Sequence, residues 1–204
     1  MRRIFTAILC ALLLAVAVGA DETKDKDKPA KPPVTAKLIA NKGTYTLDLD
    51  GMTPEQFRAA LKDAEKSGKY PKPPAVDLKL ELTNTSDKEV QIWQSGDPVQ
   101  LRLELKGKGA VSARPLLAFT REFRVPRAMT LAPGKSHTIA IKSLQFGFRG
   151  VAERAYWTEA GEYTLTARFQ TGISPPPPDS KAGRDGFAPI TLTSEPIKIK
   201  VEAK

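Results

Sequence analysis

Alternation of apolar and polar residues from position 76 onward is the feature that most restricts what this chain can fold into. In VDLKLELT (76–83), the valine and leucines fall on one side of an extended chain and the polar residues on the other. Similar segments recur about every 8 to 14 residues, with turn sequences such as NTSDKE (84–89) between them. This spacing predicts an all-β, immunoglobulin-like antiparallel sandwich. The expected strands are 38–49, 76–83, 90–93, 99–105, 111–119, 122–125, 129–131, 137–141, 163–169, 190–192 and 197–201.

One segment has the pattern of a helix instead. In TPEQFRAALKDAEKSGK, Thr53 is a suitable N-cap, Pro54 occupies the first helical position, and Gln56 has the spacing of a capping box. Gly68 provides the stop. Apolar residues recur three and four positions apart and form one narrow stripe. We therefore expect one short accessory helix at 53–67, lying on a sheet edge.

The first 37 residues carry a different pattern. Arg2 and Arg3 precede an apolar run that ends in small residues at Ala20, which predicts a signal peptide at 1–20. The run is shorter than the roughly 20 residues of a membrane-spanning helix, although retention as an anchor is the alternative. Residues 21–37 are rich in lysine and proline and predict a disordered spacer. A single sandwich domain at 38–204 is then exported to the periplasm or beyond.

Composition argues against several functional classes. The only cysteine, Cys10, lies in the signal segment, so no disulfide, thiol nucleophile or cysteine metal site is expected. The only histidine, His137, alternates with isoleucines, as expected for a residue of a strand. The net charge of +9 is dispersed and forms no nucleic-acid footprint. DLDG (48–51) lacks the glutamate that a calcium loop needs. We predict no catalytic residues, no metal and no cofactor.

Three motifs carry a resemblance to a known family. The chain resembles bacterial immunoglobulin-like sandwiches, more narrowly the BsuPI-type proteinase inhibitor domain, and as a whole it is similar to exported bacterial proteins. The matching residues are Asn84, Ser86 and Val90; Leu131, Pro133, Gly134 and Ser136; and Gly161, Tyr163, Leu165 and Ala167. Ala160 stands where the pattern has proline. The similarity covers 76–171 and implies the fold and, more weakly, inhibition. Tyr163 also suits a tyrosine corner, whose hydroxyl bonds back to the backbone.

The segment 143–159 lies between two well-patterned strands and has no clear period of its own. It is too long for a hairpin turn and unusually rich in aromatic residues and arginine. Two interpretations stay open: its aromatics close one end of the sandwich, or its polar residues form the rim of a binding site above them. The candidate rim is Arg149, Arg154 and Tyr156, and the supporting aromatics are Phe146, Phe148 and Trp157.

The predicted function is a non-enzymatic binding or structural module of the cell envelope. Its partner would be a protein or polysaccharide, and the chain would be a monomer with no membrane span after signal cleavage. Two alternatives remain open: a BsuPI-like proteinase inhibitor, and a carbohydrate-binding module that uses Trp93, Tyr156 and Trp157. The proline-rich stretch 172–187 is expected to be a solvated loop, because four consecutive prolines cannot join a ladder.

Overall fold

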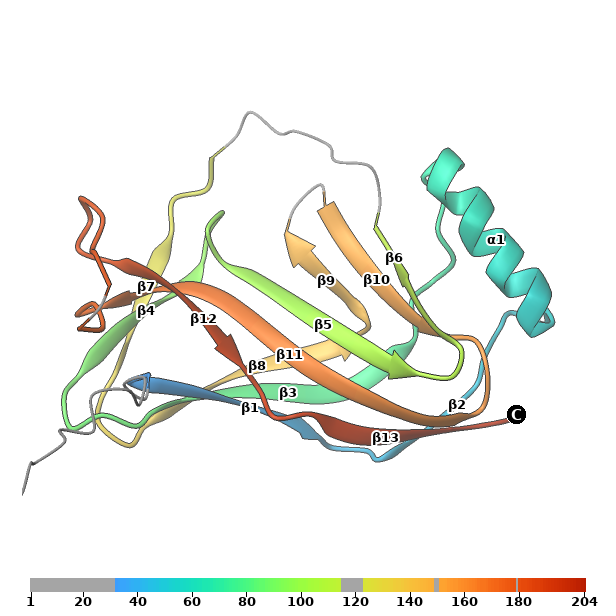
Figure 1. Cartoon of the computed structure of the whole chain (residues 1–204), viewed down its shortest axis with the longest axis horizontal. Helices are drawn as coiled ribbons and strands as arrows, with labels where there is room; N and C mark the ends of the chain where they lie inside the picture. The colour runs from blue at the N-terminus through green and yellow to red at the C-terminus, as the bar shows by residue number, and fades with distance from the viewer. Residues whose placement is uncertain (1–31, 115–122, 149–150, 179) are drawn as a thin grey trace, which may run out of the picture. The chain divides into compact units, whose positions relative to one another are not determined.

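The structure is a computed structural model that describes residues 32–114, 123–148, 151–178 and 180–204. These residues form thirteen strands and one helix (Figure 1). The elements are β1 (Val34–Ala40), β2 (Thr44–Thr46), α1 (Pro54–Ser67), β3 (Ala75–Asn84), β4 (Val90–Ser95), β5 (Gln100–Gly107), β6 (Ala110–Ala113), β7 (Arg127–Leu131), β8 (Ser136–Ser143), β9 (Gln145–Phe148), β10 (Val151–Trp157), β11 (Gly161–Ser174), β12 (Ala188–Thr193) and β13 (Ile197–Glu202). The predicted all-β sandwich with one helix is confirmed.

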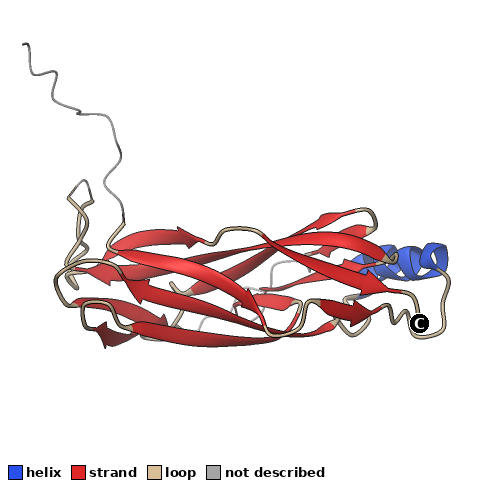
Figure 2. Cartoon of the chain, turned by 90° about the horizontal axis from the view of Figure 1, so that it is seen from below, coloured by secondary structure: helices blue, strands red, loops and turns tan. Residues whose placement is uncertain are grey.

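The strands form three sheets that lie in two layers (Figure 2). One sheet has the order β1-β3-β8, and a small one has the order β6-β10-β9. The third has seven strands, ordered β2-β13-β11-β4-β7, with β5 and β12 also paired to β11. All pairings are antiparallel except the short parallel one between β2 and β13. The central strand, β11, therefore holds the large sheet together.

The main core fills the space between the sheets, as the alternation predicts. Leu80 and Leu82 of β3 are completely buried together with Ile92 of β4 and Leu165 and Ile173 of β11. The polar residues that separate the leucines of β3 remain partly exposed on its other face. Burying these side chains removes apolar surface from water, and each Å² removed stabilises the fold by roughly 25 cal/mol. This burial is the main source of stability of the described domain.

Two predicted local motifs, the capping box of the helix and the tyrosine corner, are present. Thr53 caps α1: its side-chain oxygen accepts a hydrogen bond from the backbone N–H of Gln56. In return, the backbone N–H of Thr53 donates to the side-chain oxygen of Gln56, which completes the capping box. The hydroxyl of Tyr163 donates to the carbonyl of Glu159 at 2.7 Å, which confirms the tyrosine corner. In addition, the buried amide Nδ2 of Asn84 donates to the carbonyls of Lys88 and Leu131, both at 2.8 Å. This amide thus fastens two of the turn motifs to each other.

Several predicted boundaries are wrong. The spacer was expected to extend to residue 37, but β1 begins at Val34, which is fully buried and pairs with Asn84. The expected strand 38–49 is instead two strands, separated by 41–43. Residues 123–125 are extended but lie outside the strands, while 115–119 and Glu122 fall outside the described residues.

The loop expected at 172–187 begins later than predicted, because β11 continues to Ser174. Gly172 does not end the strand. It lies directly beneath the ring of Trp93, where a methyl group would overlap the indole. The glycine is therefore required by packing, and the strand continues into the buried Ile173.

The segment 143–159 is not the irregular connection predicted from its sequence. It forms the hairpin β9–β10, which joins β6 in the small sheet. One face of β10 contributes Ala155 and Trp157 to the main core, and the other places Tyr156 beneath α1. Because both faces of β10 are covered, its apolar residues do not alternate with polar ones, which explains the missing period.

Candidate functional site

Tyr156 was predicted to stay exposed at the rim of a site, and that prediction is wrong. The side chain is completely buried between the small sheet and α1, and its ring meets that of Phe57 edge-to-face at 5.8 Å. Its hydroxyl donates to the carbonyl of Pro71 at 2.8 Å. Burial raises the pKa of Tyr156 to about 12, because the tyrosinate would lose its hydration. The helix that sequence analysis placed on a sheet edge is what covers this residue.

The two arginines of the predicted rim have different outcomes. Arg154 is half-buried; its guanidinium lies 5.0 Å from the centre of the Tyr70 ring and donates to the carbonyl of Ala152 at 3.2 Å. It is thus held against its own sheet by a cation–π contact. Arg149 lies outside the described residues. Of the two rim residues that the structure describes, Arg154 is partly exposed and Tyr156 is buried, so these two do not share an exposed surface.

The supporting aromatics fold inward where the structure describes them. Phe146 and Trp157 are buried, with 8% and 3% of their surface exposed. The Trp157 ring lies 5.5 Å from Tyr45 and 6.2 Å from Tyr163, centre to centre. Phe148 belongs to β9, but its side chain is outside the described part of the structure. Phe146 and Trp157 thus belong to the main core and are not exposed.

The three aromatics proposed to hold a sugar do not form a platform. Tyr156 and Trp157 are buried, so neither offers a ring face to a ligand. Trp93 lies in another cluster, where it stacks on Phe187 with ring centres 5.1 Å apart. Carbohydrate binding needs coplanar exposed rings, and these residues do not provide them.

Charged side chains beside the hairpin are paired. The nearly buried carboxylate of Glu153 lies 3.6 Å from Arg102 Nη2 and 3.4 Å from Arg114 Nε. The carboxylate of Glu159 forms two ion pairs: its Oε2 lies 3.0 Å from Lys108 Nζ, and its Oε1 lies 2.9 Å from Arg58 Nη1. The hydrogen bond from Lys108 is the largest cause that lowers the pKa of Glu159, and the hydrogen bond from Arg58 lowers it further. The pairs connect the small sheet to β5 and α1, which is a structural role.

The exposed apolar surface lies in a region where sequence analysis predicted no site. Among the described residues, the large hydrophobic side chains left exposed are Phe123 and Val125, at 69% and 75%. Both belong to the extended stretch that leads into β7, Phe-Arg-Val-Pro-Arg, which we call the 123–127 segment. Exposed apolar residues close together are informative, whereas the many isolated ones on protein surfaces are not.

The 123–127 segment is fixed to the turn that follows β4. The carboxylate of Asp97 accepts the backbone N–H of Arg124 at 2.7 Å, and the backbone N–H of Asp97 donates to the Arg124 carbonyl at 3.1 Å. Arg124 Nε also lies 3.5 Å from Asp97 Oδ1. Gly96, with φ of +112°, packs so closely on Pro126 that a side chain would collide with its backbone. Phe123 and Val125 are therefore presented on a hydrogen-bonded support.

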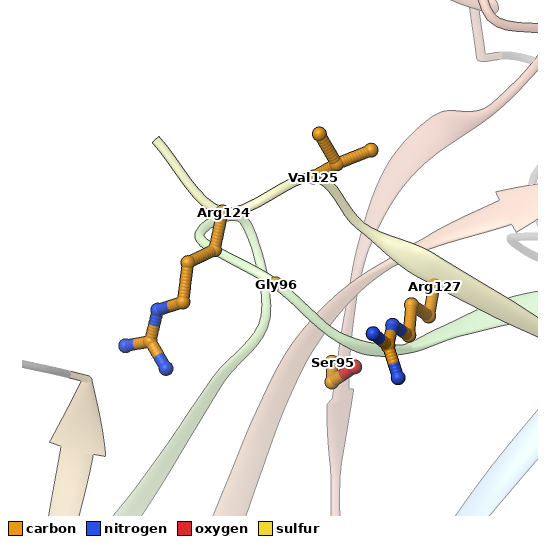
Figure 3. A pocket seen from close by; sticks show the side chains of 5 residues that line it. All are labelled: Ser95, Gly96, Arg124, Val125 and Arg127. Atoms are coloured by element: carbon orange, nitrogen blue, oxygen red, sulfur yellow. The ribbon is translucent and has the colours of Figure 1, made fainter. Parts of the chain in front are cut away.

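A cavity of about 400 Å³ lies at this place and is lined by Ser95, Gly96, Arg124, Val125 and Arg127, whose arrangement is seen in Figure 3. In this view, the Arg127 side chain extends toward Ser95, the Arg124 side chain extends downward on the other side of Gly96, and Val125 points up, away from both. The surface thus combines apolar side chains with two guanidinium groups. Arginine and aromatic residues are enriched at binding hot spots. Sequence analysis predicted a strand at 122–125 and no site. The feature of the sequence that could have indicated a site is the combination of apolar residues and arginines around a proline.

The fold and this surface define a class: an all-β sandwich with one helix and an exposed apolar and basic segment. In the part of the chain that the structure describes, no three His, Cys, Asp or Glu side chains gather closely enough to hold a metal ion. The described α-helix is neither long nor apolar enough to cross a membrane.

Comparisons with known proteins do not narrow this class. No protein-family model matches the chain, and a search of curated proteins gives no significant match. Among solved structures, the chain is similar to trypsin-activated alpha-2-macroglobulin from Escherichia coli, at 16% sequence identity and a TM-score of 0.33. The match covers 83% of this chain and 7% of that protein.

Proposed function

We propose that this protein is an exported, non-enzymatic binding module of the cell envelope, and that it holds a partner protein with the 123–127 segment. The observation that carries the proposal is the exposure of Phe123 and Val125 on a support fixed by Asp97. A pre-fixed apolar surface loses little conformational entropy on binding, so more of its contact energy is available as affinity. The signal-like first 20 residues support export to the envelope.

Retention of envelope proteins on the purified protein tests this proposal. The wild type is compared with the double variant Phe123→Ser, Val125→Ser. The matched control is Thr138→Ser, Ala140→Ser, which changes two exposed residues of β8. We expect the wild type and the control to retain the same protein from an envelope extract, and the double variant to lose it while keeping its melting temperature. Equal retention by all three would show that this segment is not the binding surface.

The second candidate is a proteinase inhibitor of the BsuPI-like type, which the sequence motifs suggest. Arg124 on a fixed, exposed segment favours it, since trypsin-like proteases accept arginine in their specificity pocket. A protease, however, also binds an extended segment through main-chain hydrogen bonds. The N–H and carbonyl of Arg124 are already bonded to Asp97. The binding module therefore ranks first.

Titration of trypsin separates the two candidates. A non-inhibitory binding module leaves the residual protease activity unchanged at a molar excess of the purified protein. A stoichiometric loss of trypsin activity that Arg124→Ala abolishes would favour the inhibitor instead. Arg168→Ala is the matched control, since Arg168 is another exposed arginine, on β11.

A further inference from the structure

The strand that follows the 123–127 segment lies at the end of its sheet. Among the described residues, β7 pairs with β4 and with no second strand. One side of a terminal strand presents N–H and C=O groups that another strand can pair with. The outward side chains next to this edge, Ala128 and Thr130, are small and exposed. They leave room for the side chains of a neighbouring strand.

Other terminal strands lack part of this combination. β2, β6 and β9 have only three or four residues. β1, β5, β8 and β12 are longer, and each also pairs with a single strand, but neither of the two exposed large apolar side chains lies near them in sequence. β7 alone continues directly from exposed apolar residues and arginines. Its edge and the 123–127 segment thus form one continuous surface.

From this juxtaposition we infer that β7 receives an acidic, extended segment of the partner protein as an additional strand of the seven-stranded sheet. The inference rests on the proposed function and specifies its partner. Main-chain pairing to β7 supplies affinity, and Phe123 and Val125 provide apolar contacts beside the first residue of that strand. Arg127 opens β7, and the chain carries a net charge of +9. Both favour carboxylates on the incoming strand.

Two other occupants fit the same surface less well. A lipid surface would accept apolar and basic side chains, but it cannot pair the main-chain groups at the edge of β7, which are costly to place in hydrocarbon. A second copy of this chain would bring two net-basic molecules together and place Arg127 near its own counterpart. An acidic strand can both form hydrogen bonds with the main chain at the edge of β7 and place carboxylates near Arg127.

A phage library of random twelve-residue peptides, selected on the purified protein, is the probe. We expect the enriched peptides to alternate acidic and apolar residues and to contain no proline. Binding of the tightest peptide should weaken about tenfold in Arg127→Glu, because a complementary charge becomes repulsive. It should be unchanged in Lys62→Glu, an equal change of charge at an exposed position of α1. Enrichment of neutral or basic peptides, or of none, would overturn the inference.

Methylation of single backbone nitrogens in that peptide tests strand pairing itself. Successive N–H groups of a strand point to opposite edges, so methylation at alternate positions should weaken binding about tenfold or more while intervening positions tolerate it. Uniform tolerance would overturn strand addition. Binding of the protein to phosphatidylglycerol vesicles through this surface would indicate a lipid surface as the occupant and would overturn the inference. Dimerisation in sedimentation experiments that Arg127→Glu strengthens would indicate a second copy of the chain and would overturn it as well. If the extract protein is still retained through Phe123 and Val125 in those cases, the proposed function stands and only this inference fails.

Discussion

The β9–β10 hairpin and the 123–127 segment contain the same kinds of residues and place them in opposite environments. Both combine aromatic and aliphatic side chains with arginine. In the hairpin, Trp157 and Tyr156 are buried on opposite faces of one strand. In the segment, Phe123 and Val125 remain largely exposed. Residue types typical of binding hot spots therefore do not distinguish a closed core from a surface.

The covering elements make the difference. α1 lies over one face of β10, and the main core lies under the other (Figure 1). The 123–127 segment is supported from one side only, by the turn that contains Gly96 and Asp97. An aromatic strand between two layers stabilises the fold, whereas a fixed segment with one uncovered side can bind a partner.

Trp157→Ala should have the largest effect. Trp157 is only 3% exposed, and its ring packs against Tyr45 and Tyr163. Truncation leaves a cavity, so the free energy of unfolding should fall by about 3 to 5 kcal/mol. Urea unfolding followed by fluorescence of the remaining Trp93 measures this. A loss below about 1 kcal/mol would mean that the hairpin is not part of the core.

Tyr156→Phe should have a smaller effect that depends on pH. Near neutral pH, loss of the hydroxyl bond to Pro71 should lower the free energy of unfolding by about 1 kcal/mol. Burial raises the pKa of Tyr156 to about 12 in the folded state, above the 10.0 that is ordinary for a tyrosine. The stability linked to this group is therefore complete below pH 10 and is lost as pH rises toward 12.

The variant should accordingly show a shallower alkaline loss of stability between pH 10 and 12, measured by urea unfolding at each pH. Some slope should remain, because burial also raises the pKa of Tyr163. An unchanged slope in Tyr156→Phe would indicate that Tyr156 is hydrated in the folded state, and the proposed cover by α1 would then be wrong.

Much of the fold follows from local rules. The alternation in 76–83 specifies which face of β3 is buried, and the capping residues Thr53 and Gln56 define where α1 begins. Tyr163 forms its corner because the hydroxyl and its acceptor are only four residues apart. Features of this kind depend on neighbours in sequence, and sequence analysis predicts them correctly.

The candidate site depends on distant partners and could not be predicted in this way. Whether Tyr156 is exposed depends on α1, about 100 residues away in the chain. Phe123 and Val125 alternate like residues of a half-buried strand, yet no element covers them among the described residues. Gly172 looks like a strand end, but it accommodates Trp93 from β4. In each case, tertiary packing decides the outcome.

Arg154→Ala should change stability only slightly, although the residue belongs to the buried hairpin. Its guanidinium lies over Tyr70 at 5.0 Å and remains partly exposed. Cation–π contacts at such positions contribute about 0.5 to 1 kcal/mol. Thermal unfolding should show a correspondingly small decrease in Tm, which Arg154→Lys restores in part. No change in either variant would show that Arg154 contributes nothing to the packing of the small sheet.

The double variant Phe123→Ser, Val125→Ser should have the smallest effect on stability and thus completes the contrast with Trp157→Ala. Both side chains are largely exposed, so their removal returns little apolar surface to water, and surface substitutions of this kind stay within about 0.5 kcal/mol. The support at Asp97 uses the backbone and side chain of Arg124, which the variant leaves intact. Urea unfolding should therefore give the same midpoint and the same slope as the wild type. A loss of more than about 1 kcal/mol would mean that another part of the chain covers these residues in solution. The 123–127 segment would then resemble the β9–β10 hairpin and would no longer be available to a partner.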